Sequence, residues 1–194
     1  MWGDEHEVTA VEYKPEIAAI YADSFPNDTV IVGDAHQYLL EHFEEYDFIW
    51  SSPPCPTHSR MNTLIVNNGT IKARYPDMKL YEEIIFLKHW YKGMYCVENV
   101  RSYYSPLITP QEIQSHYFWS NFIILDTKKS REKVVNQKGQ LLEVKMQQQG
   151  IEINDWHGYK GDRRTLINNM VEPELGAHIL DAALNPIKLQ GALL

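Results

Sequence analysis

The chain has 194 residues, of which 44% are hydrophobic and 23% are charged, and its formal net charge is −8 at pH 7. This length suits one domain with a sizeable core. The acidic balance excludes a protein that coats nucleic acid non-specifically, because phosphate contacts need Lys and Arg, but it allows a local basic groove. The two cysteines, Cys55 and Cys96, indicate a reducing cytoplasm rather than a disulfide framework. No run approaches the roughly 18 apolar residues of a membrane span, so no membrane partner is expected.

Short apolar strands alternate with amphipathic helices over the first fifty residues. Strands are predicted over 7–13, 28–32 and 46–50, and helices over 14–24 and 35–43. Alternation at this spacing is typical of a parallel sheet with helices on its faces. The sequence therefore predicts an α/β fold with a doubly wound, mostly parallel sheet.

The remainder of the chain contains longer and more polar segments. We predict a long loop over 57–77, a helix over 80–91, strands over 94–97 and 117–125, a solvated loop or small hairpin within 126–161, and helices over 163–169 and 173–184. Three regions are expected, namely a core over 1–125, a short polar insertion over 126–161 and closing helices over 162–194.

A buried strand ends in Pro53-Pro54, and Cys55 follows directly. Ligands collect beyond the carboxyl ends of strands in open α/β sheets, so Cys55 is a candidate nucleophile. The alternative is a small buried hydrophobe in a tight turn. A thiolate can activate a carbon that has no lone pair, such as C5 of a pyrimidine, by adding at C6. Glu98, just beyond the next strand, could act as the acid at N3 of the base if its site raises its pKa.

Acidic residues also end the first two strands. Glu12 lies at the end of the first strand and Asp34 follows the second. A carboxylate in the first position commonly binds ribose hydroxyls, and one in the second position can accept a hydrogen bond from an adenine amine. Each alone is often a solvated carboxylate. Together, ahead of a Pro-Pro-Cys turn, they favour S-adenosylmethionine over NAD.

These motifs give the sequence a resemblance to the DNA (cytosine-5) methyltransferases. Ser52-Pro53-Pro54-Cys55-Pro56-Thr57-His58-Ser59 is similar to the family's catalytic motif, which usually reads Pro-Pro-Cys-Gln-x-Phe-Ser, and Glu98-Asn99-Val100 matches its Glu-Asn-Val motif. Val11-Glu12-Tyr13 and Gly33-Asp34-Ala35 resemble the family's cofactor-binding strand ends. Asn168-Asn169-Met170-Val171-Glu172-Pro173 is similar to the closing Gly-Asn-x-Val-x-Pro motif, with Asn168 in place of the glycine.

The resemblance implies a sheet of the S-adenosylmethionine-dependent methyltransferase type and a covalent route to C5 of a flipped-out cytosine. It implies that Cys55 attacks C6, that Glu98 contacts N3 and that Asn99 orients the catalytic loop. S-adenosyl-L-methionine would be bound by Glu12, Tyr13, Asp34, Ala35, Pro54, Asn169 and Val171.

The implied partner is double-stranded DNA. Ser59 would touch the target phosphate, and the loop over 57–77, with Arg60 and Arg74, would close over the DNA. His116 follows Gln114-Ser115 at the place of the family's Gln-x-Arg-x-Arg strand, where this sequence has no arginine. The target-recognition region is short, so modest sequence selectivity is expected.

The family's first motif, a strand with a Gly-rich turn that cradles the methionine part of the cofactor, is absent. We therefore expect a sheet that is incomplete at its N-terminus, and an upstream segment or a second chain that supplies the strand and Gly-rich loop. A catalytically silent DNA- or partner-binding remnant is the alternative function, and an amine methyltransferase is a third. The context expected is bacterial or phage-type. No metal is expected, because the histidines show no metal-ligand spacing.

Overall fold

The computed structural model describes residues 2, 5–126, 141–148 and 150–187. The protein is a mixed α/β protein whose chain divides into two compact units. The first unit comprises Met1–Glu41 and Ser130–Asp181, and the second comprises His42–Lys129 and Ala182–Leu194. This division differs from the three regions expected, because the N-terminal segment belongs with the later part of the chain.

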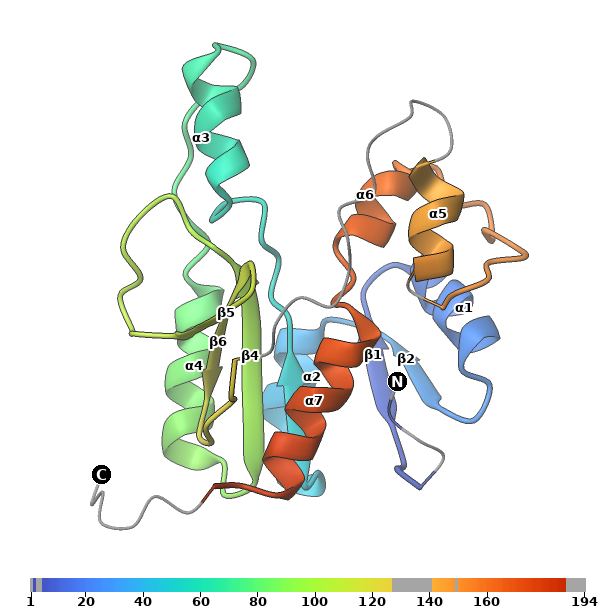
Figure 1. Ribbon diagram of the computed structural model, residues 1–194, viewed down its shortest axis with the longest axis vertical. Coiled ribbons are helices and arrows are strands. Elements are labelled where there is room, and N and C mark those ends of the chain that lie inside the picture. The colour runs from blue at the N-terminus through green and yellow to red at the C-terminus, as the bar shows by residue number, and fades with distance from the viewer. Residues whose placement is uncertain (1, 3–4, 127–140, 149, 188–194) are drawn as a thin grey trace. The chain divides into compact units, whose positions relative to one another are not determined.

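The first unit contains a parallel two-stranded sheet (Figure 1). Strand β1 (Thr9–Glu12) pairs with β2 (Thr29–Val32), and helix α1 (Pro15–Ser24), which connects them, packs on both strands. Proline at the start of α1 costs little, because the first N–H groups of a helix have no intrahelical partner. The predicted strand–helix–strand order is confirmed here.

Two further helices of the first unit, α5 (Leu141–Gln148) and α6 (Arg163–Asn168), pack on each other (Figure 1). Helix α5 lies in the segment predicted as a loop or hairpin, so that prediction is wrong for this part. Its Leu, Glu, Lys, Met and Gln residues all have good helix propensity. The many polar residues around them led to the prediction of a loop. Residues 127–140 and 149 of the same segment lie outside the described residues.

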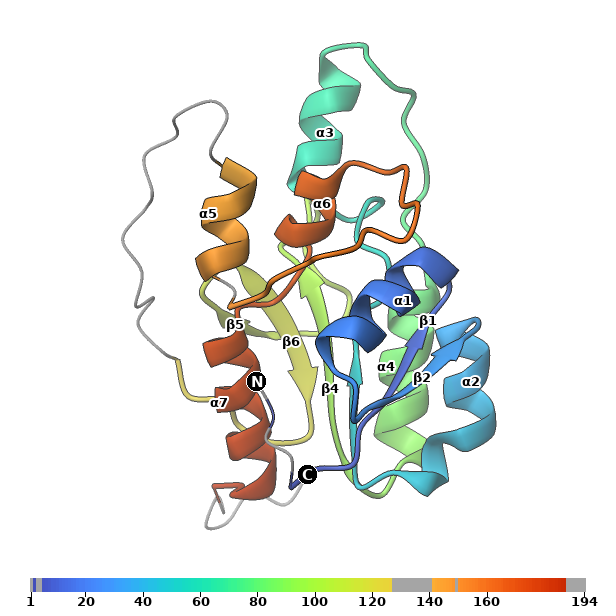
Figure 2. The ribbon, with the colours of Figure 1, turned by 90° about the vertical axis from the view of Figure 1, so that its right-hand side faces the viewer.

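A four-stranded mixed sheet forms the centre of the second unit (Figure 2). Its strands are β3 (Phe48–Ser51), β4 (Met94–Val100), β5 (Gln111–Ile113) and β6 (His116–Ser120), in the order β3-β4-β6-β5. Strands β3 and β4 are parallel, and β6 is antiparallel to both of its neighbours. Three of the four strands therefore run in one direction. The described residues form two sheets rather than the single sheet predicted.

Helix α4 (Lys79–Trp90) covers one face of this sheet (Figure 1). Leu80, Ile84, Leu87 and Trp90 recur at the helical spacing that predicts one buried face. Leu80, Ile84 and Leu87 are buried, but Trp90, at the end of the helix, is 66% exposed, so the prediction is wrong for that residue. The three buried residues pack towards β4, in which Cys96 and Val97 are completely buried. Cys96 is therefore part of the apolar core and is not accessible for chemistry.

Helix α3 (Arg60–Asn67) occupies part of the predicted loop over 57–77, which is a second error of the sequence prediction. Ser59 caps this helix, because its side chain accepts a hydrogen bond from the Met61 backbone N–H at 3.2 Å. Met61 and Leu64 are 61% and 57% exposed. The helix lies beyond the carboxyl end of β4 (Figures 1 and 2). A buried apolar face is the usual sign of a helix in a sequence, and the apolar residues Met61 and Leu64 of this helix are not buried.

The predicted strand over 117–125 ends earlier, at Ser120. The side chain of Asn121 accepts a hydrogen bond from Tyr95 N at 3.0 Å and donates one to the Gly93 carbonyl at 2.9 Å. An amide side chain therefore replaces strand pairing at the start of β4. Strand β5 was not predicted, since it has only three residues. The remaining elements are α2 (Ala35–His42), a 3₁₀ turn (Phe43–Glu45) and α7 (Pro173–Leu184).

Candidate functional site

Cys55 lies in a tight turn beyond the carboxyl end of β3. The backbone N–H groups of His58 and Ser59 both donate to the Cys55 carbonyl, at 2.9 and 3.1 Å. Cys55 itself is half-buried. The turn therefore holds the thiol at the strand end where α/β proteins place their chemistry.

Asn99, on β4, fixes the entry to this turn. Its amide Nδ2 donates to the Pro53 carbonyl at 2.9 Å, and its Oδ1 accepts from Val100 N at 3.0 Å. Asn99 is 1% exposed, so both polar ends of the buried side chain are used. The Asn99 side chain thus binds the backbone of the turn that precedes the segment over 57–77.

Glu98 is a buried carboxyl group whose side chain accepts a hydrogen bond from Ser52. Burial raises the pKa of Glu98 to about 7, and the bond from Ser52 opposes this rise. The indole Nε1 of Trp50 donates to Ser52 Oγ at 2.8 Å, which orients that hydroxyl. Near neutral pH Glu98 is consequently available in its protonated form, as a general acid must be.

The Cys55 thiol responds to the same surroundings. Burial first, and then the negative charge of Glu98, raise the pKa of Cys55, while a backbone hydrogen bond opposes the rise. The resting thiol is therefore protonated, and a proton on Glu98 removes the charge that disfavours the thiolate. The two groups are close enough for the ionisation of one to influence the other.

His116, on β6, approaches Glu98 from the neighbouring strand. Its Nε2 lies 3.8 Å from Glu98 Oε1. When protonated, the imidazole favours the carboxylate form of Glu98. His116, which is expected to contact DNA, therefore also lies beside Glu98, the candidate general acid.

The other residues expected to contact DNA surround the turn. Ser59 caps α3, Arg60 Nε donates to the Ser102 carbonyl at 3.2 Å, and Arg74 Nη2 donates to the Pro56 carbonyl at 3.2 Å. Both guanidinium groups thus brace the turn from outside. Pro54 precedes Cys55 and is exposed.

The sequence interpretation missed several residues that support this site. Ser52 binds Glu98, Ser51 donates to the buried Glu83, and His58 binds Tyr104. The close spacing of His58 to Cys55 could have identified that histidine. No pattern in the sequence connects Glu83 or Tyr104 to the turn.

In the first unit, the acidic strand ends predicted to bind a nucleoside are adjacent. Glu12 pairs in register with Val32, and Gly33 N donates to the Glu12 carbonyl at 3.1 Å. Glu12 Oε1 accepts from Lys14 N at 2.8 Å. Asp34 Oδ1 accepts from His36 N at 2.9 Å, at the start of α2, whose first residue is Ala35.

Tyr13 follows Glu12 and is 74% exposed. Its ring is available for stacking, and the neighbouring carboxylates can accept hydrogen bonds. An exposed aromatic ring and two carboxylates therefore lie at one edge of the two-stranded sheet.

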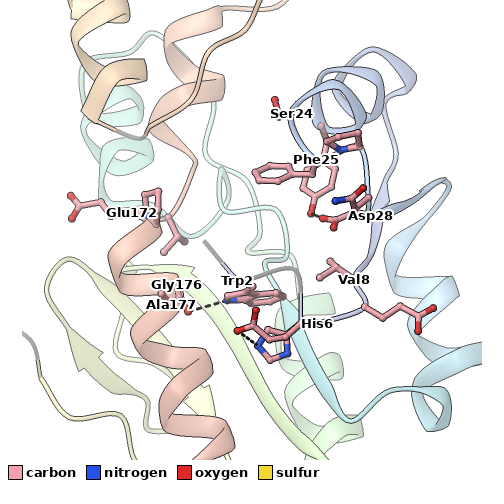
Figure 3. Close-up of a pocket in the computed structure, with 16 residues that line it drawn as sticks. Trp2, His6, Val8, Ser24, Phe25, Asp28, Glu172, Gly176 and Ala177 are labelled. Carbon is pink, nitrogen blue, oxygen red and sulfur yellow. Dashed lines mark hydrogen bonds and ion pairs between the residues drawn. The ribbon is translucent and has the colours of Figure 1, made fainter.

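A cavity of about 670 Å³ lies elsewhere in the first unit (Figure 3). Val8 and Asp28, which precede β1 and β2, line it together with Val171 and the first turns of α7. Trp2 closes one side, since its indole donates to the Gly176 carbonyl at 3.2 Å. Val171 thus lies near the amino ends of the strands, whereas Glu12 and Asp34 follow their carboxyl ends. Asn169 caps the C-terminus of α6.

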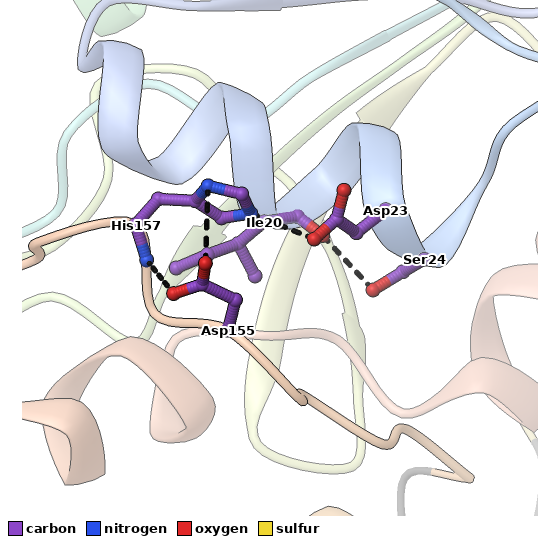
Figure 4. A network of polar contacts seen from close by, with 5 residues as sticks. All are labelled: Ile20, Asp23, Ser24, Asp155 and His157. Carbon is purple, nitrogen blue, oxygen red and sulfur yellow. Dashed lines mark hydrogen bonds and ion pairs between the residues drawn. The ribbon is translucent and has the colours of Figure 1, made fainter.

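A polar network ties a loop of the first unit to α1 (Figure 4). His157 Nε2 lies 2.7 Å from Asp23 Oδ2, and His157 N donates to Asp155 Oδ1 at 2.8 Å. The hydrogen bond to Asp23 raises the pKa of His157. The network is exposed and far along the chain from the candidate catalytic residues.

No group of three His, Cys, Asp or Glu side chains within the described residues is arranged to hold a metal ion. None of the helices in this part of the chain is long and apolar enough to cross a membrane. No protein-family model matches the sequence, and a search of curated proteins finds no significant match.

Proposed function

We propose that this chain is a DNA (cytosine-5) methyltransferase that acts on a flipped-out cytosine in double-stranded DNA. The observation that carries the proposal is the pairing of Cys55, on its Pro-Pro-Cys turn, with a buried Glu98 whose pKa is raised to about 7. A half-buried thiol and a protonated carboxyl group are the nucleophile and the acid that this chemistry needs. The mixed α/β architecture is compatible with a methyltransferase-type sheet, since doubly wound sheets often include an antiparallel strand.

Cys55 first gives its proton to solvent and then opens the reaction as a thiolate. Its sulfur bonds to C6, the C5=C6 pair shifts to C4=C5, and the C4=N3 pair takes the proton of Glu98 on N3. The product is a neutral enamine whose C5 is nucleophilic. Glu98 thereby prevents a negative charge from building on the base, and Asn99 keeps the turn in place through the Pro53 carbonyl.

S-adenosylmethionine, when bound, would supply the electrophilic methyl group that C5 needs and would leave as S-adenosylhomocysteine. The C5 proton then leaves to solvent. N3 returns its proton to Glu98, and the S–C6 bond breaks to restore Cys55. Glu12, Tyr13 and Asp34 would hold the adenosine part, with Ala35 beside them. Val171 lines the cavity at the amino ends of these strands, so it is not part of this contact set.

Contacts to DNA are assigned to Ser59, Arg60, Arg74 and His116. The backbone bonds of Arg60 and Arg74 use one or two of the five guanidinium donors, so each can also meet a phosphate. The position of His116 beside Glu98 would bring it close to the base.

An additional strand is part of the proposal. Within the described residues, β1 pairs only with β2, and β3 pairs only with β4, so each has an edge without a partner strand. A partner chain that adds a strand and a Gly-rich turn would complete cofactor binding. Calorimetry of S-adenosylmethionine with this chain, alone and co-expressed with a fragment that carries such a strand, tests this. No affinity in either case would favour a silent remnant.

The catalytic proposal is tested with a duplex that contains 5-fluorocytosine at the target position. Fluorine replaces the C5 proton that must leave, so the covalent adduct persists. Mass spectrometry should locate the adduct on Cys55 in the wild-type protein and in Cys96→Ala. Cys55→Ala should give none, and Glu98→Gln should form it much more slowly. Methylation that survives Cys55→Ala would indicate an amine methyltransferase instead.

A further inference from the structure

We propose that His58 is a positioning residue for Cys55, and that its hydrogen bond to Tyr104 locks the turn that carries the thiol. The proposal rests on the proposed function only in taking Cys55 as the nucleophile. It assigns a role to a part-buried pair of side chains that the methyl-transfer chemistry does not itself use.

His58 is anchored at three points. Its backbone N–H donates to the Cys55 carbonyl at 2.9 Å, and its own carbonyl accepts from Tyr103 N at 3.0 Å. Its ring atom Nδ1 lies 2.6 Å from the Tyr104 hydroxyl. The residue is only 1% exposed. A displacement of this ring would therefore move the N–H that holds Cys55.

Tyr104 connects this anchor to the helix beneath the sheet. The Tyr81 hydroxyl, on α4, accepts from Leu107 N at 3.2 Å and donates to the Tyr104 hydroxyl at 3.4 Å. Tyr104 can then donate its own proton to His58 Nδ1. Ser102 Oγ also donates to the Tyr104 carbonyl at 2.5 Å. The donors thus run in one direction, from Leu107 to His58.

The neutral form of His58 suits this arrangement, because neutral imidazole offers one nitrogen as an acceptor. Burial lowers the pKa of His58, and the backbone and charge of Asp77 partly oppose the effect. Asp77 is also tied to the turn, since its N–H donates to Thr57 Oγ1 at 3.0 Å. Residues 57 and 58 are therefore held from two sides.

The backbone around His58 supports the same conclusion. Ser59 forms an isolated antiparallel bridge with Ser102. The segment that carries Tyr103 and Tyr104 therefore runs alongside the turn that carries Cys55. The hydrogen bond between the two side chains is the contact that fixes the ring of His58 within this pairing.

Alkylation of Cys55 by iodoacetamide, without DNA or cofactor, tests the proposal. Tyr104→Phe removes only the hydroxyl, so the turn should loosen and Cys55 should react about fivefold faster, the effect of one buried hydrogen bond. The pH profile of the reaction should shift to a lower apparent pKa, because the burial that raises the pKa of Cys55 relaxes. Cys96 should stay unreactive, which shows that the loosening is local.

Tyr91→Phe is the matched control. The Tyr91 hydroxyl also makes a 2.6 Å bond, to the Tyr46 carbonyl, but at the opposite end of β3 from Cys55. This variant should leave the alkylation of Cys55 unchanged. An unchanged or slower rate in Tyr104→Phe would overturn the proposal.

A double-mutant cycle tests whether the two side chains act as a pair. His58→Phe should accelerate alkylation, and adding Tyr104→Phe should change the rate little further, because the bond is already lost. Effects that simply multiply would refute the pairing. Adduct formation with the 5-fluorocytosine duplex should slow by about fivefold in Tyr104→Phe. If the wild type forms no adduct while the alkylation results hold, the proposed function fails and the positioning role stands.

Discussion

The carboxylate of Glu98 and the imidazole of His116 lie 3.8 Å apart on neighbouring antiparallel strands. In the β4–β6 ladder Glu98 pairs with Phe118, and His116 pairs with Val100, so the two side chains are diagonal neighbours on one face. Glu98 is only 7% exposed. Its charge state therefore depends on the protein rather than on solvent, which makes it the most informative residue for a pH experiment.

Glu98→Gln should change how stability depends on pH. The pKa of Glu98 rises from 4.5 to about 7 on folding, so the folded state holds this proton more tightly than the unfolded state does. The contribution of this proton to the stability of the folded state is fully present below pH 4.5 and is lost as the pH rises through about 7. Since one pH unit corresponds to about 1.4 kcal/mol, the loss is on the order of 3 kcal/mol.

Urea unfolding of wild type and Glu98→Gln between pH 4.5 and 8 measures this effect. The glutamine variant should lose less free energy of unfolding over that range than the wild type. Glu44→Gln, at an exposed carboxylate in the 3₁₀ turn, is the control and should follow the wild type. Parallel curves for Glu98→Gln and the wild type would contradict the pKa of Glu98.

Asn99→Ala should destabilise the second unit by about 1–3 kcal/mol, because the Pro53 carbonyl and Val100 N–H lose their partner inside the protein. Denaturant unfolding gives the value. Asn68→Ala, at an exposed position after α3, should stay within about 0.5 kcal/mol of the wild type. Equal effects of the two substitutions would show that the buried amide does not hold the turn.

The sequence reveals those parts of the fold where burial follows a simple period. Leu80, Ile84 and Leu87 show α4 because one face of the helix is buried. Helix α3 has no fully buried face, since Met61 and Leu64 are largely exposed, and its clearest local indication is the cap at Ser59. Strand β6 stops at Ser120 because of the two bonds of the Asn121 side chain, which no periodicity encodes.

The residues of the candidate site likewise include some that the sequence predicts and some that only the structure shows. Cys55 is recognisable because it follows a buried strand, and Glu98 and Asn99 because they lie at the carboxyl end of the next one, where side chains reach a common edge. The elevated pKa of Glu98 depends on how deeply the fold buries it, which a sequence does not specify. The bond from His58 to Tyr104 joins residues 46 positions apart, so it emerges only from the tertiary structure.

Two glycines should respond in opposite ways to alanine. A Cβ on Gly93 would meet the Tyr91 hydroxyl and, at 2.7 Å, the Asp47 carbonyl. Neither can yield easily, because that hydroxyl is bonded to Tyr46 and the carbonyl belongs to the backbone. Gly93→Ala should therefore cost about 1–3 kcal/mol.

Gly176 lies within α7, and a Cβ there would meet no atom within 4 Å. Gly176→Ala should stabilise the protein by about 0.5–1 kcal/mol, since alanine reduces the backbone entropy lost on helix formation. Thermal unfolding of the two variants measures both effects. A destabilising Gly176→Ala, or a neutral Gly93→Ala, would contradict the packing described for these positions.

The contact between His157 and Asp23 should make one loop of the first unit sensitive to pH. The hydrogen bond to Asp23, aided by the charges of Asp155 and Asp23, raises the pKa of His157 above its ordinary value of 6.5. Protonated His157 is thus favoured in the folded state. The stabilisation is present below pH 6.5 and is lost as the pH rises through the elevated value.

NMR titration of the His157 ring should give a pKa above 6.5 in the wild type, and a lower value in Asp23→Asn, which loses the largest contribution. Asp155→Asn should lower the pKa by less, because its carboxylate lies 3.9 Å from Nδ1 while Asp23 lies 2.7 Å from Nε2. Amide hydrogen exchange in the loop around His157, corrected for the intrinsic effect of pH, should accelerate above the elevated pKa in the wild type. In Asp23→Asn the corrected exchange should already be fast below it. A wild-type titration that matches Asp23→Asn would show that the contact does not form in solution.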